Sequence, residues 1–184
     1  HSSIKDWAKA ETYLSLLLKK APRNDQGMAL LATVYSAQNK NEQAYTLYME
    51  RFRNNPSGQT SFDELIDVAF ASGKQSELLA ALKEQYTKKQ SESVAIAQLK
   101  CLAVTPESFD SGIAFAESLR ERFPGSLRLV IEHASLLYLA GQFQDSLKQI
   151  QKMIDENQLP ERTFVLGGLV ARALKREELA ENCY

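Results

Sequence analysis

Residues 25–58 read DQGMALLATVYSAQNKNEQAYTLYMERFRNNPSG, and this stretch decides the fold. Its first half places four apolar side chains at i, i+3, i+4 and i+7, which is the spacing of one face of an amphipathic helix. These residues are Met28, Leu31, Ala32 and Tyr35. A polar turn at 39–41 follows, and a second helical stretch ends before Pro56, because a proline ring disfavours helical backbone at the preceding residue. The stretch therefore predicts two helices joined by a short turn.

The same pattern recurs every 34 residues along the chain. One series of equivalent positions is Ala10, Ala44, Leu78, Gly112, Ser146 and Ala180. A second series, four residues further on, is Leu14, Tyr48, Leu82, Ala116, Ile150 and Tyr184. A third is Ala32, Ile66, Lys100, Ala134 and Gly168. A fixed period of this length is typical of a solenoid whose repeating unit is a pair of antiparallel helices. We therefore expect an all-α fold without a sheet.

This period predicts one continuous array over residues 1–184. Residues 3–22 are expected to form the second helix of a partial unit. The full units are 25–58, 59–92, 93–126 and 127–160, and a truncated unit covers 161–184. Turns between the paired helices are expected near 38–42, 72–75, 105–109, 140–143 and 174–176.

The unit resembles the tetratricopeptide repeat, or TPR. That family has a large residue at position 4, Leu-Ala or Leu-Gly at 7 and 8, Tyr at 11, Ala at 20, an aromatic residue at 24 and Pro at 32. Residues 25–58 match all of these positions. Position 4 of the other units is held by Phe62, Ile96, Val130 and Phe164. The resemblance covers nearly the whole chain and implies an α-solenoid that winds as a right-handed superhelix.

Unit 93–126 departs most from the pattern. Lys100 stands where a small residue is usual, Gly112 replaces the usual Ala at the closest approach of the helices, and Pro106 falls in the inter-helix turn. We expect the packing geometry to deviate in this unit.

Composition excludes several classes of function. The net charge of −1 offers no attraction for nucleic acid or an anionic membrane, and no run of eighteen apolar residues could span a bilayer. Cys101 and Cys183 belong to different units, so we expect two free thiols rather than a disulfide. The chain starts without an initiator Met, so we expect a fragment. The absence of a targeting signal is then compatible with both the cytoplasm and the periplasm.

Residues suited to catalysis are scarce, and we expect no enzyme activity, cofactor or metal. His133 is the one internal histidine, and it takes position 7, normally Leu, on the packed face of its helix. A core histidine explains it better than a catalytic one. The CxxC, HExxH, phosphate-loop and GxSxG motifs are all absent.

The resemblance places partner binding on the concave face, at positions 2, 5, 9 and 12 of each first helix. The candidate binding residues there are Asp63, Asp67, Phe70, Val104, Arg128, Ile131, Tyr138, Arg162, Leu169 and Arg172. For the apolar members, packing against the next unit is an equally good explanation. For Asp63, a favourable position near the helix N-terminus is the better one.

The leading hypothesis is a non-catalytic adaptor that binds a peptide or helix of a partner protein. TPR domains that hold a peptide's terminal carboxylate use Lys and Asn at several of these positions, and those residues are absent here. Two alternatives stay open. The array could be a structural spacer that self-associates through its ends, or it could be the substrate-guiding arm of a larger enzyme or of a bacterial secretion or assembly machine.

Overall fold

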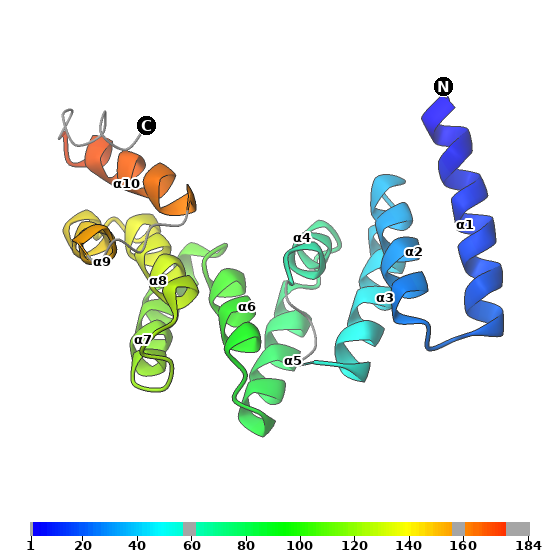
Figure 1. Ribbon diagram of the computed structural model, residues 1–184, viewed down its shortest axis with the longest axis horizontal. Helices are drawn as coiled ribbons and strands as arrows, with labels where there is room; N and C mark the ends of the chain where they lie inside the picture. The colour runs from blue at the N-terminus through cyan, green and yellow to red at the C-terminus, as the bar shows by residue number, and fades with distance from the viewer. Residues whose placement is uncertain (1, 57–61, 156–160, 176–184) are drawn as a thin grey trace. The chain divides into compact units, whose positions relative to one another are not determined.

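The computed structural model describes residues 2–56, 62–155 and 161–175, and in these ranges every regular element is a helix (Figure 1). Side chains are described for the same residues except 2–5, 154, 155 and 161–164. The α-helices are α1 (Ser2–Lys20), α2 (Asp25–Ala37), α3 (Asn41–Asn54), α4 (Asp63–Ala71), α5 (Gln75–Lys88), α6 (Glu92–Leu102), α7 (Phe109–Arg120), α8 (Leu127–Leu139), α9 (Phe143–Asp155) and α10 (Glu161–Ala173). A 3₁₀ turn, η1 (Pro106–Ser108), precedes α7. The expected all-α fold is confirmed.

Within each compact unit, most helices that follow one another in the chain pack together. α2 lies against both α1 and α3, and α8 lies against both α7 and α9. Figure 1 shows this order within each of two compact units, His1–Ala97 and Gln98–Tyr184. A single 184-residue array and its right-handed winding stay predictions.

The hairpin turns repeat at the level of the backbone as well as the sequence. Asn39, Gly73, Gly141 and Lys175 are spaced by 34 residues or a multiple of it, and all have positive φ, at 58°, 70°, 77° and 56°. In the turns at Asn39, Gly73 and Gly141, two backbone hydrogen bonds close the end of the first helix. The 5→2 bonds are Asn39 N–H to Ser36 O, Gly73 N–H to Phe70 O and Gly141 N–H to Tyr138 O. The 6→1 bonds are Lys40 N–H to Tyr35 O, Lys74 N–H to Ala69 O and Gln142 N–H to Leu137 O. This is the Schellman motif, which satisfies carbonyls at a helix C-terminus.

The turn between α6 and α7 is built differently, as the departures in unit 93–126 predict. Pro106 opens η1 in place of the left-handed residue, and Glu107 occupies the position equivalent to Asn39 and Gly73. The pyrrolidine ring fixes φ near −65°, which suits the start of a 3₁₀ turn. The helix pair of this unit is therefore joined by a longer connection, from Ala103 to Ser108.

In the first compact unit, two residues that define the period lie in the core. Ala44 is 0% exposed and Tyr48 is 6% exposed, where α3 packs on α2. The Tyr48 hydroxyl lies 3.3 Å from Thr33 Oγ1. Asn24 caps α2, because its side chain accepts a hydrogen bond from the Gly27 N–H.

In the second unit, Gly112 forms a notch that Leu136 fills. A Cβ added at Gly112 would lie 3.1 Å from Leu136 Cδ2 and 3.3 Å from Leu102 Cβ. The neighbouring pair of helices, α8 and α9, closes on a core of Ala134, Leu147 and Ile150. The expected deviation in unit 93–126 thus takes the form of a glycine paired with a large leucine.

Candidate functional site

The acidic candidates lie in the first unit, on α4. Asp63 is the first residue of that helix and is half-buried, which fits a carboxylate that stabilises the N-terminus of the helix. Asp67 is exposed one turn further on, and Phe70 is half-buried. Of the three, Asp67 is the side chain most accessible to a partner.

In the second unit, three first helices form a pocket of about 360 Å³. Lys100 of α6, Ile131 and Ser135 of α8, and Val165 and Leu169 of α10 line it, and we call this surface the first-helix face. Two of the predicted residues, Ile131 and Leu169, are therefore brought together. Val165 is 53% exposed and Leu169 is 39% exposed, so apolar side chains at the pocket are accessible to solvent. A concave site with accessible apolar lining suits a side chain of a bound protein.

An ion pair that lies at this pocket was not predicted from the sequence. Lys100 Nζ lies 3.8 Å from Glu132 Oε1, and both side chains are largely buried, with exposures of 20% and 16%. Both residues line the pocket. A signal was present, because Lys100 replaces a small residue in its 34-residue series, whereas Ala32 and Ala134 at the equivalent positions are 0% exposed. A charged lysine is costly to bury without a partner of opposite charge. An acidic residue facing Lys100 from the next 34-residue repeat could therefore have been expected.

Tyr138 packs against its own helical hairpin. Its ring centroid lies 5.5 Å from that of Phe143, and both rings cover the core cluster around Ala134 and Ile150. Tyr138 is half-buried and is not among the residues that line the first-helix face. The aromatic pair therefore supports the corner of the α8–α9 hairpin.

The remaining candidates do not gather at this pocket. Val104 is 51% exposed in the connection after α6. Arg128 is exposed in the first turn of α8, and Arg172 is exposed in the last turn of α10. Arg162 belongs to α10, but its side chain lies outside the described residues. Arg162 and Arg172 are ten residues apart on one helix, about 15 Å along its axis, so the arginines do not form a single cluster.

His133 and Cys101, the histidine and the cysteine among the described residues, are both buried. His133 is 3% exposed, and burial lowers its pKa, with Glu117 opposing and Arg120 reinforcing the shift. Burial also raises the pKa of the free Cys101 thiol to about 12, which keeps it protonated and unreactive at neutral pH. Within the described ranges, no cluster of three His, Cys, Asp or Glu side chains could hold a metal. Helices in the same ranges are too short or too polar to span a bilayer.

Comparison with known proteins identifies the fold. A tetratricopeptide repeat protein from Parabacteroides merdae superposes with a TM-score of 0.69 at 14% identity, over 99% of this chain and 72% of that one. PilW, described as a widely conserved type IV pilus biogenesis factor, superposes with a TM-score of 0.65 at 18% identity, over 99% of this chain and 84% of PilW. At the level of sequence, neither a family model nor a curated protein matches. The chain therefore has the helical-repeat fold of tetratricopeptide repeat proteins.

Proposed function

We propose that this chain is a non-catalytic adaptor, a single TPR-like array that binds a peptide or helix of a partner protein on its first helices. The observation that supports this most directly is the first-helix face, where Ile131, Val165 and Leu169 line a pocket and two of them are well exposed. Buried apolar anchors supply most of the free energy in such interfaces. The ion pair between Lys100 and Glu132 adds a polar rim that fixes the orientation of a bound segment.

Charged residues outside the pocket would add to recognition within each compact unit. In this proposal, basic residues of the partner face Asp63 and Asp67 in the first unit, and acidic residues of the partner face the arginines in the second. The further contacts proposed are Phe70, Arg128, Tyr138, Arg162 and Arg172 on the first helices, and Val104 in the connection after α6. One structural neighbour, PilW, is a pilus biogenesis factor, so we infer that an assembly or secretion apparatus is a suitable setting for such an adaptor.

A quantitative pull-down from cells that contain the native partners tests this proposal. Val165→Glu and Leu169→Glu place a carboxylate in the pocket from positions that are already exposed, so both variants should fold. We expect each to lose most of the partner that the wild type recovers. Leu139→Glu is the matched control, because Leu139 is 47% exposed and lies outside the pocket. Equal recovery by all four proteins would remove the first-helix face as the binding site.

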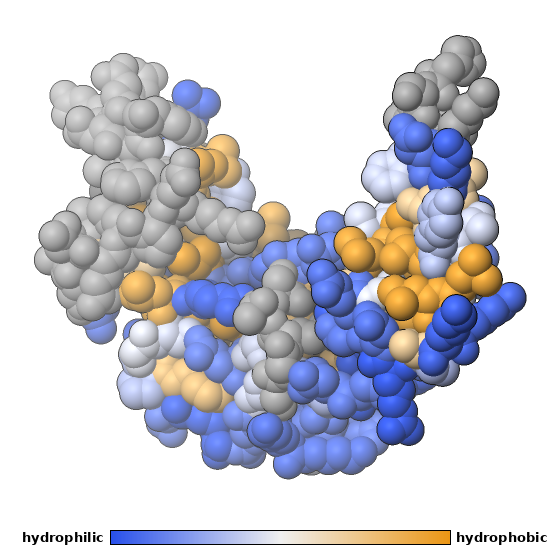
Figure 2. Space-filling view, turned by 45° about the vertical axis from the view of Figure 1, so that its right-hand side comes forward, coloured by the Kyte–Doolittle hydropathy of each residue, from blue (hydrophilic) through white to orange (hydrophobic). Residues whose placement is uncertain are grey.

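A second candidate, self-association, is favoured by the exposed face of α1. Trp7, Tyr13, Leu16 and Leu17 are 37–72% exposed there, and Figure 2 shows hydrophobic surface over the N-terminal helices. Ala10 and Leu14 are only partly buried, whereas their equivalents Ala44 and Tyr48 are buried. Light scattering over a concentration series tests this candidate, with a Tyr13→Lys, Leu16→Lys double variant as comparison. A wild type that stays monomeric throughout would exclude it.

A further inference from the structure

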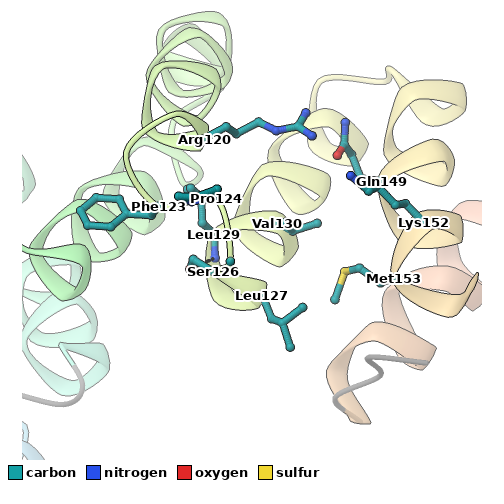
Figure 3. Close-up of a pocket in the computed structure, with 11 residues that line it drawn as sticks. Arg120, Phe123, Pro124, Ser126, Leu127, Leu129, Val130, Gln149, Lys152 and Met153 are labelled. Atoms are coloured by element: carbon teal, nitrogen blue, oxygen red, sulfur yellow. Dashed lines mark hydrogen bonds between the residues drawn. The ribbon is translucent and has the colours of Figure 1, made fainter. Parts of the chain in front are cut away.

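The second unit contains another pocket, of about 250 Å³, which shares no residue with the first-helix face (Figure 3). It lies where the loop at 123–126 and the start of α8 meet the second helices α7 and α9. Its lining includes Arg120 of α7, Leu127 and Val130 of α8, and Gln149, Lys152 and Met153 of α9. We call it the second-helix pocket.

The charge of the second-helix pocket has one sign. Arg120 and Lys152 line it, and the lining includes no carboxylate. In Figure 3, the Arg120 guanidinium and the Gln149 side chain extend toward each other across one end of the pocket. Arg120 makes no salt bridge with any carboxylate that the structure describes, whereas Lys148, one turn before Lys152 on α9, is paired with Asp145 at 2.7 Å. A carboxylate from outside would complement the cationic end of the pocket.

The other end of the pocket is apolar. Leu127 and Met153 lie there, and Val130 lies between them and the polar end (Figure 3). These side chains offer no hydrogen bond to a free inorganic anion, but they can contact an aliphatic side chain adjacent to the carboxylate. The volume is below the roughly 300 Å³ at which pockets for small molecules and cofactors begin. One or two side chains of a peptide fit this size better than a whole cofactor does.

From this combination we infer that the second-helix pocket binds a protein segment in which Glu or Asp is flanked by aliphatic residues. The carboxylate pairs with Arg120 beside the positive charge of Lys152, and the neighbouring aliphatic side chain packs on the partly exposed Leu127 and Val130, next to the buried Met153. This site is separate from the first-helix face, and the two can be tested independently. Because solvent-exposed ion pairs contribute little, a short segment binds weakly by itself and gains affinity as part of a larger partner.

The test is a titration of the ¹⁵N-labelled protein with short capped peptides, followed by NMR. With acetyl-Leu-Glu-Leu-amide, we expect shifts in the amide signals of residues 126–130 and 149–153. Acetyl-Leu-Gln-Leu-amide, which lacks the charge, and acetyl-Gly-Glu-Gly-amide, which lacks the aliphatic groups, should each bind about five-fold more weakly or worse. Equal affinity for either of these peptides would contradict the inferred ligand.

Three variants locate the binding. The Arg120→Gln, Lys152→Gln double variant should weaken binding of Leu-Glu-Leu about five-fold or more. Leu127→Glu places a carboxylate inside the pocket and should abolish binding. It should still fold, because Leu127 is the first residue of α8, where an acidic side chain is favourable. The Arg122→Gln, Lys148→Gln double variant removes the same charge outside the pocket, from the turn after α7 and from α9, and it should bind as the wild type does.

Two further outcomes would overturn the proposal. Inorganic phosphate that shifts the same amides with an affinity equal to that of Leu-Glu-Leu would show a site for small anions, not for a peptide. Peptide shifts that map elsewhere, or that persist in the Arg120→Gln, Lys152→Gln variant, would show that the pocket is not the site. Leu169→Glu should leave peptide binding unchanged, so failure of this proposal is distinguishable from failure of the adaptor proposal.

Discussion

The Ser146 hydroxyl donates a 2.7 Å hydrogen bond to the Ala134 carbonyl oxygen, and both residues are 0% exposed. Ser146 belongs to the 34-residue series of Ala10 and Ala44, and Ala134 belongs to that of Ala32. The bond therefore joins one residue from each of two series that define the repeat, and it lies at the contact between α9 and α8. A hydroxyl fits in place of the usual alanine because a backbone carbonyl can accept a second hydrogen bond.

Ser146→Ala should be nearly neutral, and Ser146→Leu should not. Alanine loses a hydrogen bond of about 1 kcal/mol but gains some helix propensity, so the net loss in unfolding free energy should be about 0.5 kcal/mol. Leucine at a position with 0% exposure must displace α8, at about 1–3 kcal/mol. Urea unfolding measures both. A leucine variant as stable as the alanine variant would mean that α8 and α9 are not closely packed here.

Gly73→Ala and Gly141→Ala test the left-handed turn residues. An added Cβ would find nothing within 4 Å at either site, so any loss comes from the backbone, where φ is 70° and 77°. We expect about 1–2 kcal/mol of destabilisation for each, again by urea unfolding. Gly125→Ala is the matched control, because its Cβ would also be free of contacts and its φ is not in the left-handed region. That variant should be neutral or slightly stabilising; equal losses at all three sites would contradict the argument.

A structural feature could be predicted from the sequence when the residues that form it lie within one repeat, and less directly when they come from several repeats. The helix pairs and turns follow from the period, because each unit specifies its own amphipathic faces and its own breaks. Asn39 and Lys175 as left-handed residues could have been inferred from their alignment with Gly73 and Gly141. The pocket around Lys100 could not be inferred as directly, because residues from three successive 34-residue repeats form it.

The candidate site was therefore predicted only in part. Helical spacing placed Ile131 and Leu169 on one face of their helices, and the structure brings them to one pocket. The same spacing did not show that Tyr138 lies outside this pocket, where its ring packs on Phe143 of the following helix. The second-helix pocket was missed because α7, α9 and the loop before α8 form much of it, whereas the candidates were sought on first helices. Its two cations also belong to different 34-residue repeats, Arg120 to 93–126 and Lys152 to 127–160.

Tyr48→Ala tests the repeat frame itself. Tyr48 is 6% exposed, and its position between α2 and α3 follows from the 34-residue series. Truncation of a buried aromatic residue should lower the unfolding free energy by about 3–5 kcal/mol. Thermal unfolding should show a correspondingly large fall in Tm, with Tyr13→Ala as control because Tyr13 is 72% exposed. A shift near zero for Tyr48→Ala would mean that the frame is misplaced.

Gly112→Ala should destabilise the protein even though alanine is the better helix former. The gain in helix propensity is about 1 kcal/mol, but the new Cβ would lie 3.1 Å from Leu136 Cδ2, and overpacking costs about 1–3 kcal/mol. The residues at the equivalent positions two units earlier are Ala44 and Val68. Adding Leu136→Val to Gly112→Ala reproduces that pair and should recover part of the loss. A double-mutant cycle in urea measures this coupling, and additive effects would show that the two residues do not determine each other's size.

His133→Leu should stabilise the protein and flatten its dependence on pH. His133 occupies position 7, where Leu31, Leu65 and Leu99 are buried at the equivalent sites, and its buried Nε2 has no hydrogen-bond partner in the described structure. Removing that unsatisfied atom should raise the unfolding free energy at pH 7 by about 1 kcal/mol.

The sign of the pH effect follows from the lowered pKa of the folded imidazole. Below about pH 6.5, the histidine of the unfolded chain binds a proton while the buried one stays neutral. The unfolded state then holds more protons, so the stability of the wild type falls as the pH drops through this window. Unfolding in urea from pH 7.5 to 5 measures the slope, which should be smaller in His133→Leu. The carboxylates of Glu11 and Asp25 also have lowered pKa values, through Lys40 and Arg51, but their contribution is lost only below about pH 4.5. An unchanged slope between pH 7.5 and 5 in the variant would show that His133 is not the titrating group.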